Sequence, residues 1–298
     1  MKKQITQKFN WMKYRRLYFV ISSTLIAISV FSLVKWGLNL GVEFKGGVAV
    51  EYSLQKQIDT DVVQGKLAES GLEVSSVQSL EGSSVLIQFE QLDVDSRERL
   101  REELVFLGGE ESVEVLYQNI GPTIGPELVK KTIYAIVIAA IVILAWVAYQ
   151  FKNVIYGTSA ILAMLHDTFI LVGSFSLLGH MYGAEIDFLF VTALLTTLSF
   201  SVHDTIVVYD RIREIRKSRT GSFMDIANSA LSETMRRSIN NSLTIIIMLV
   251  SLVVLGGATI KWFAIALLIG TVLGTYSSPF VAVPLLVTWV GFSRRKSL

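Results

Sequence analysis

Two pairs of ionisable residues lie inside otherwise apolar stretches of this 298-residue sequence. His203 and Asp204 stand in the middle of "SFSVHDTIVVYDRIRE", and His166 and Asp167 occupy a similar position in an earlier apolar stretch. A charge inside the hydrocarbon of a membrane is costly, so such residues are rarely kept without a role. A buried carboxylic acid can take up and release a proton as its surroundings change. These residues therefore predict proton exchange coupled to motion.

The composition indicates a membrane protein, because 52% of the residues are hydrophobic, only 17% are charged and the mean hydropathy is +0.53. About 20 helical residues cross a hydrocarbon core about 30 Å thick. Six segments are long and apolar enough: Leu17 to Val34, Thr132 to Phe151, Val154 to Leu178, Ile186 to Tyr209, Ser242 to Leu255 extended toward Thr259, and Trp262 to Val290. We therefore expect a polytopic α-helical membrane protein with six transmembrane helices.

The distribution of charge predicts the orientation of these helices. Six Lys and Arg precede the first span, seven lie between the fourth and fifth, and three follow the sixth. The positive-inside rule places these segments, and so both termini, in the cytoplasm. Residues 37–131 hold 17 acidic and 8 basic residues and are then outside. The first span lacks a small-residue cleavage site, so we expect an uncleaved anchor and not a signal peptide.

The expected organisation follows from these assignments. It comprises a cytoplasmic segment over 1–16, a first helix over 17–36, an extracytoplasmic domain over 37–131, and helices 2–6 over 132–298 with a cytoplasmic loop over 210–241.

The segment between the first two spans predicts an α+β domain. Strands are expected over 48–54, 74–80, 83–90 and 113–119, with helices after Asp59 and after Asp95 or Ser96. The order β-α-β-β-α-β is that of a ferredoxin-like unit. Gly46 and Gly47, where the chain leaves the membrane, are expected to serve a bulge or a close backbone approach. No cluster with catalytic spacing occurs in it, so we expect a binding or mechanical role, with a passive domain as the alternative.

Depth along the helices separates the two ionisable pairs. His166 and Asp167 lie ~18–20 Å from the cytoplasmic end of the third span, and Asp204 lies ~9 Å from the same face. Arg236 and Arg237 open the fifth span at about the depth of Asp204, where an arginine can pair with a carboxylate or extend toward the surface. A static ion pair with Arg237 is the alternative to a functional Asp204, and hydrogen bonding to a neighbouring helix is the alternative for His166 and Asp167.

The sequence offers little for other chemistry. It contains no cysteine, no metal-ligand spacing and no grouping of nucleophile, base and orienting residue. We therefore expect neither an enzyme, nor a metal site, nor a cofactor.

Four stretches together resemble the SecF family of the bacterial protein-export machinery, a relative of the proton-driven resistance-nodulation-division exporters. They are "LGVEFKGGVAVEY" (40–52), "IGPTIGPEL" (120–128), "FSVHDTIVVYDRIRE" (200–214), and "RRSINNSLT" (236–244) with "GTYSSPFVAVPLL" (274–286). They span nearly the whole chain and occur in the family's order.

The resemblance implies a subunit of the bacterial cytoplasmic membrane that acts with SecD. Together they would help preproteins cross through the SecYEG channel, using the proton motive force and contacting membrane lipids but no nucleic acid. The resemblance assigns the role of the proton-linked acid to Asp204 and the role of its basic partner to Arg237, with Arg236 as the less favoured neighbour. His203 stands where the family more often has Asn and adds a second titratable group beside the acid. Glu43 stands where Asp is usual.

Two other classes of function remain open. A stand-alone proton-driven transporter of lipids or small molecules would use the same buried acid, although six spans suggest half of a pseudo-symmetric pair. A non-conducting structural or assembly subunit would tolerate loss of the charge of Asp204.

Overall fold

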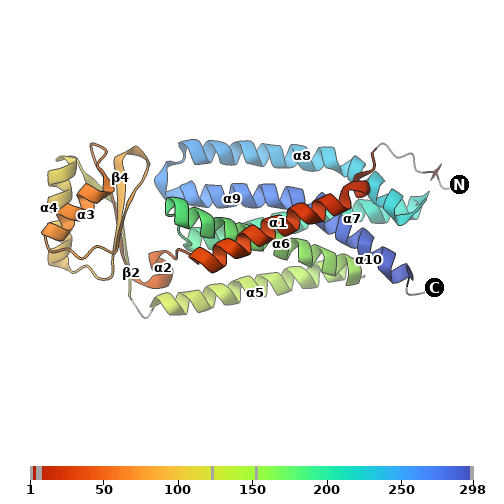
Figure 1. The fold of residues 1–298 in the computed structure, drawn as a ribbon, viewed down its shortest axis with the longest axis horizontal. Helices are drawn as coiled ribbons and strands as arrows, with labels where there is room; N and C mark the ends of the chain where they lie inside the picture. Colours follow the sequence, from red (N-terminus) through yellow and green to blue (C-terminus); the bar gives the residue numbers. More distant parts are fainter. Residues whose placement is uncertain (1–2, 5–8, 122–123, 152–153, 296–298) are drawn as a thin grey trace.

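The computed structural model describes residues 3–4, 9–121, 124–151 and 154–295. A bundle of long helices occupies one end of the molecule and an α+β domain the other (Figure 1). The bundle consists of α1 (Arg15–Trp36), α5 (Ile124–Phe151), α6 (Val154–Tyr182), α7 (Phe188–Ser218), α8 (Phe223–Leu255), α9 (Gly257–Ser277), a π-helical turn η3 (Ser278–Ala282) and α10 (Val283–Arg295).

Within the described residues, six helical stretches are long and apolar enough to cross a membrane, as the sequence predicts. The sixth runs from Ile260 to Gly291 and combines α9, η3 and α10. The predicted break between the second and third spans falls on residues 152–153, which lie outside the described residues. Residues 210–241, expected as a cytoplasmic loop, instead consist mostly of the end of α7 and the start of α8. Ser222 begins α8 with a capping box, because its hydroxyl accepts from the Asp225 backbone and the Asp225 carboxylate accepts in return.

The α+β domain lies between α1 and α5 in the chain. It consists of α2 (Val42–Lys45), β2 (Gly47–Ser53), α3 (Thr60–Glu69), β3 (Ser76–Ser79), a short turn η2 (Glu81–Ser83), β4 (Ser84–Phe89), α4 (Val94–Gly108) and β5 (Val113–Ile120). The strands form an antiparallel sheet in the order β3-β4-β2-β5. The predicted succession of strands and helices is therefore present, and the ferredoxin-like assignment stays a prediction.

The two faces of this sheet meet different partners. Val48, Val50 and Tyr52 of β2 point into a core that also contains Leu67 of α3 and Leu100 of α4. The alternate residues of β2 point the other way, toward the helix bundle, which follows from the period of two in a strand. The sheet thus lies between α3 and α4 on one side and the bundle on the other (Figure 1).

The helix caps confirm one prediction and correct another. Asp59 begins α3, and its carboxylate accepts from the backbone N–H of Asp61 at 3.1 Å. The prediction of Asp95 or Ser96 as the cap of α4 is wrong. Asp93 takes this role, because its carboxylate accepts from the backbone N–H of Ser96 at 2.7 Å.

Glycines allow close approaches both at the membrane exit and within the bundle. Gly47 has φ +119°, and a Cβ there would lie 2.6 Å from the carbonyl oxygen of Phe89. In the bundle, a Cβ on Gly270 of α9 would lie 2.2 Å from Thr197 of α7. The second pair explains why the last span carries small residues where it meets its neighbour.

Candidate functional site: polar residues within the helix bundle

Asp204 is a buried acid on α7, 8% exposed. Its Oδ1 accepts a hydrogen bond from the Ser238 hydroxyl of α8 at 2.8 Å. Its Oδ2 is buried and has no hydrogen-bond partner among the described residues. A buried acceptor without a partner carries a desolvation cost, which a bound proton or an approaching cation relieves.

A cavity of about 650 Å³ lies between α7 and α8. Asp204 lines it together with several ionisable neighbours. His203, Arg236, Arg237 and Ser238 line it together with Asp204. The side chains of His203 and both arginines are exposed, whereas Asp204 is not. In the part of the chain that the structure describes, no ion pair joins Asp204 to either arginine. Arg237 therefore shares a cavity with the acid without forming the static pair that was one alternative.

His166 and Asp167 form a separate and more enclosed group on α6. They are 5% and 6% exposed. The imidazole Nδ1 of His166 lies 2.9 Å from Oδ1 of Asp167. Oδ2 of Asp167 accepts from the hydroxyls of Ser201 on α7 and Ser277 on α9, each at 2.6 Å. Neighbouring helices therefore satisfy this carboxylate by hydrogen bonds.

The π-helical turn η3 stands next to both groups. Ser278, its first residue, lies 3.0 Å from the hydroxyl of Thr205, which follows Asp204 in the chain. Ser277, the residue before η3, is a donor to Asp167. π-Helical turns are rare and frequently occur at functional sites.

The sequence predicts the buried acids but not most of their hydrogen-bond partners. No role beside these acids was predicted for Ser201, Ser238, Ser277 or Ser278. Their residue type was the one indication in the sequence, because hydroxyl residues in a span can hydrogen-bond across helices. Their facing directions depend on how the helices pack.

A second polar region lies outside the bundle core, where the sheet meets the ends of the helices. Glu185, between α6 and α7, accepts hydrogen bonds from the side-chain amides of Gln78 on β3 and Gln88 on β4 at 2.8–2.9 Å. Glu43 and Asp187 line the same cavity of about 370 Å³. Burial raises the pKa of Glu185, against the hydrogen bonds from the two glutamines, which lower it. Burial also raises the pKa values of Glu43 and Asp187.

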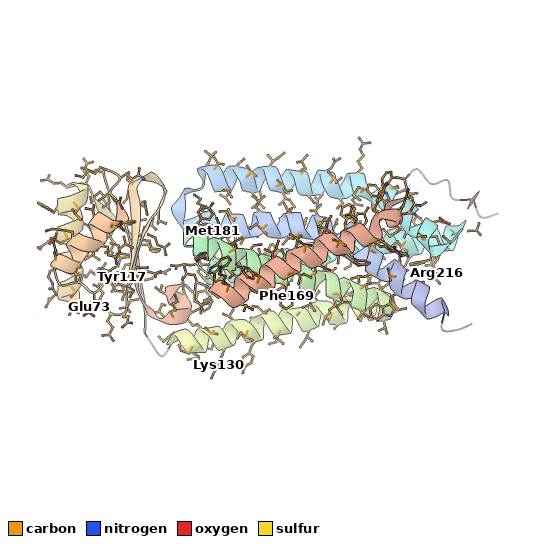
Figure 2. All side chains as sticks on the ribbon, viewed as in Figure 1. Glu73, Tyr117, Lys130, Phe169, Met181 and Arg216 are labelled. Atoms are coloured by element: carbon orange, nitrogen blue, oxygen red, sulfur yellow. The ribbon has the colours of Figure 1, made fainter. Side chains whose placement is uncertain are left out.

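The predicted site residues thus fall into three places. Asp204, His203, Arg236 and Arg237 line one cavity, His166 and Asp167 form the enclosed group on α6, and Gly46 and Gly47 join α2 to β2. Figure 2 shows the two ends of the bundle: Met181 on α6 lies at the end beside the domain, and Arg216 on α7 lies near the opposite end. Among the described residues, no group of three or more His and acidic side chains is arranged to hold a metal ion.

Two family models match the chain. Residues 105–291 match the model described as "Protein export membrane protein SecD/SecF, C-terminal". Residues 31–58 match the "SecD/SecF GG Motif", which includes Gly46 and Gly47.

Individual proteins agree with these models. The protein translocase subunit SecF of Thermobaculum terrenum is 40% identical, over 93% of this chain and 92% of its own length. The corresponding subunit of Synechocystis is 34% identical, over 95% and 94%. The protein translocase subunit SecDF of Bacillus subtilis is 30% identical over 97% of this chain, which covers 39% of that longer protein.

A solved structure has the same arrangement of elements. The crystal structure of SecDF from Thermus thermophilus, described as a translocon-associated membrane protein, matches 96% of this chain with a TM-score of 0.85 and 29% identity. This chain covers 39% of that structure. The family models and the extensive identity to SecF subunits lead to one conclusion: the chain belongs to the SecD/SecF family of protein export membrane proteins.

Proposed function

We propose that this chain is a SecF-type subunit that acts with a SecD-type partner to move proteins across the bacterial inner membrane. The multi-pass architecture and the relatives, which are named protein translocase subunits, support this assignment. Its match to 39% of the SecDF chains supports a partner that supplies the remaining part. In this proposal the complex acts on preproteins at the SecYEG channel, within the lipid bilayer and with both termini of this chain in the cytoplasm.

Proton exchange at Asp204 drives the movement in this proposal. The observation that carries it is the state of the Asp204 carboxylate, which is buried, has one oxygen without a partner, and faces a cavity shared with Arg237. When Asp204 is charged, it attracts Arg237 across this cavity. When Asp204 binds a proton, the attraction is lost and α7 and α8 can repack. His203, which lines the same cavity, is placed to share the proton.

The energy available suits such a change. One proton crossing about 100 mV releases about 2.3 kcal/mol before any contribution from a pH difference. This biases a two-state equilibrium by a factor of several tens. The α+β domain, which contacts the bundle through Glu185, is the part that would move and hold or pull an emerging chain.

The test replaces Asp204 with Asn in membrane vesicles that carry out export. The late stage of translocation is measured with and without a proton gradient. We expect Asp204→Asn to lose the stimulation by the gradient, and Asp210→Asn to keep it. Asp210 is the matched control, because it lies on the same helix with a side chain that is 47% exposed. Full gradient-stimulated export by Asp204→Asn would contradict the proposal and favour a structural subunit.

Co-purification distinguishes a SecF-type subunit from a stand-alone transporter. A SecF-type subunit should be isolated from membranes with a second multi-span protein. Isolation of this chain alone, with proton-driven transport of lipids or small molecules after reconstitution, would favour the stand-alone transporter.

A further inference from the structure

The His166–Asp167 pair is more completely enclosed than the proposed proton site, and the proposed function gives it no task. Three hydrogen-bonding groups surround the Asp167 carboxylate: the His166 imidazole at 2.9 Å and the hydroxyls of Ser201 and Ser277 at 2.6 Å. These groups come from α6, α7 and α9. His166 lies 12 residues after Val154, the first residue of the 29-residue helix α6, which places the pair near the middle of the third span.

The charge of this pair depends on how many protons it holds. Among the described residues, the adjacent imidazole of His166 is the only contact of Asp167 that can become positive. With one proton the pair is neutral overall, whichever of the two groups holds it. A second proton leaves the pair with a charge of +1, and loss of the first leaves −1.

The helices packed against α6 bring few other ionisable groups to this depth. Tyr276 of α9 lies with its ring 6.3 Å from that of His166, and Tyr18 lies on α1. The facing helix α7 carries Asp204 and His203 about one turn beyond Ser201, the α7 residue that contacts Asp167. The middle of α5, over 135–148, and residues 278–290 contain no ionisable side chain. Within the described residues, Asp204 is therefore the one acid near this pair on the helices packed against α6.

His166 also has an unused hydrogen-bonding position. Its Nε2 is buried and has no partner among the described residues, although the side chain is only 4% exposed. A satisfied structural histidine would use both ring nitrogens. The unpaired nitrogen marks a place where this pair can bind or release a proton.

Adjacent serines link the pair to Asp204. Ser277 donates to Asp167, while Ser278 contacts Thr205, the residue after Asp204. Ser278 also donates to the backbone carbonyl of Ser201 at 3.4 Å, and Ser201 itself donates to Asp167. Ser277 thus contacts Asp167, and the adjacent Ser278 contacts the residue after Asp204, so neighbouring positions at the start of the π-helical turn link the two acids. A change of charge at either acid alters hydrogen bonds to this turn.

We propose that His166 and Asp167 form a second proton-binding site within the membrane, coupled to Asp204 through Ser277 and Ser278. The proposal rests on the proposed function, since it assigns a second site to the same proton-driven cycle. The ligand is the proton itself. In this arrangement, proton binding at one site changes the affinity of the other site for its proton.

Asp167→Asn separates this role from a structural one. An asparagine keeps all three contacts, because its carbonyl oxygen accepts from Ser201 and Ser277 and its amide donates to Nδ1 of neutral His166. It cannot exchange a proton. A structural role predicts parental export by Asp167→Asn and failure of Asp167→Ala. The second-site proposal predicts that Asp167→Asn lowers gradient-stimulated export at least tenfold, with the amount of inserted protein unchanged.

Ser277→Ala provides an independent variant and a different readout. It removes one donor to Asp167 without removing a titratable group. We expect it to shift the pH midpoint of gradient-stimulated export relative to that of the parent. Ser174→Ala is the matched control, because the Ser174 hydroxyl bonds to the carbonyl of Ile170 on its own helix. An unchanged pH midpoint in Ser277→Ala would overturn the coupling through the serines.

The outcomes distinguish the second site from the proposed function. If Asp204→Asn abolishes the stimulation and Asp167→Asn retains it, the second site is refuted and the proposed function stands. If Asp204→Asn retains the stimulation, the proposed function fails, and the coupling of Asp167 to Asp204 fails with it. Loss in both variants, with the shifted midpoint of Ser277→Ala, supports both.

Discussion

Gln88 of β4 donates hydrogen bonds from its side-chain amide to both carboxylate oxygens of Glu185, at 2.8 and 2.9 Å. Gln78 of β3 donates a third hydrogen bond to the same carboxylate. One side chain between α6 and α7 thus holds two strands of the sheet against the helix bundle. This contact offers a direct physical connection between helix movement and domain movement.

We expect Glu185→Ala to loosen the domain from the bundle. The substitution leaves two partly buried amides without their acceptor, at a cost of about 1–3 kcal/mol. Hydrogen exchange of the β3 and β4 backbone in the full chain measures it, and exchange there should become faster. Glu69→Ala is the control, since the Glu69 side chain is 72% exposed and pairs with Lys66 of the same helix. Equal protection in the parent and in Glu185→Ala would refute this role of Glu185.

The contact should also depend on pH. Burial raises the pKa of Glu185 above its ordinary value of 4.5 when the domain is docked. The docked state then binds more protons than the separated state, so the contact weakens as pH rises from about 4.5 through the raised pKa. Glu43 and Asp187, whose pKa values burial also raises, act in the same direction. Exchange protection of β3 and β4, corrected for intrinsic rates, should fall over this range. Glu185→Gln should make this protection less dependent on pH. Protection that does not change with pH in the parent would contradict the prediction.

Tyr209 should contribute to bundle stability apart from any proton exchange. Its ring is fully buried, and its hydroxyl lies 2.7 Å from the Ser159 hydroxyl and donates to the carbonyl of Ala282 at 3.1 Å. Tyr209→Phe removes these contacts between α6, α7 and η3. We expect a loss of about 1–3 kcal/mol, seen as a lower unfolding temperature in detergent. Tyr149→Phe, at a side chain that is 72% exposed, should leave this temperature unchanged.

Gly47 should tolerate no side chain. Gly47→Ala combines φ +119° with a Cβ 2.6 Å from the Phe89 carbonyl oxygen, so we expect the sheet to lose about 1–3 kcal/mol. Faster hydrogen exchange in β2 and β4 of the full chain reports this loss. Gly65→Ala is the matched control, because a Cβ there meets nothing within 4 Å and the residue lies inside helix α3. The control should be neutral or slightly stabilising, and similar exchange in the two variants would count against the steric argument.

The sequence was sufficient for the spans, the order of the domain elements and the buried acids, because hydrophobic length and period depend on local residues. The sequence could not identify a helix cap where two nearby residues both have a side chain that favours that position. Asp93 and Asp95 both suit a helix cap, and only the carboxylate contact with the Ser96 backbone decides between them.

The partners of Asp204 show the same limit. Depth along a helix places Arg237 near Asp204, whereas the direction of each side chain decides that Ser238 makes the hydrogen bond. The acid–amide contact of Glu185 was missed for a similar reason, since it joins residues about 100 positions apart in the chain.

Proton entry during export reports directly on proton exchange at Asp204. Vesicles that contain the complete complex and a pH-sensitive dye are supplied with a preprotein under a proton gradient. Protons should cross with the parent and with Asp210→Asn, whereas Asp204→Asn should reduce this flux to the level of vesicles without the complex. Proton entry through Asp204→Asn as fast as through the parent, with export still stimulated, would contradict the account.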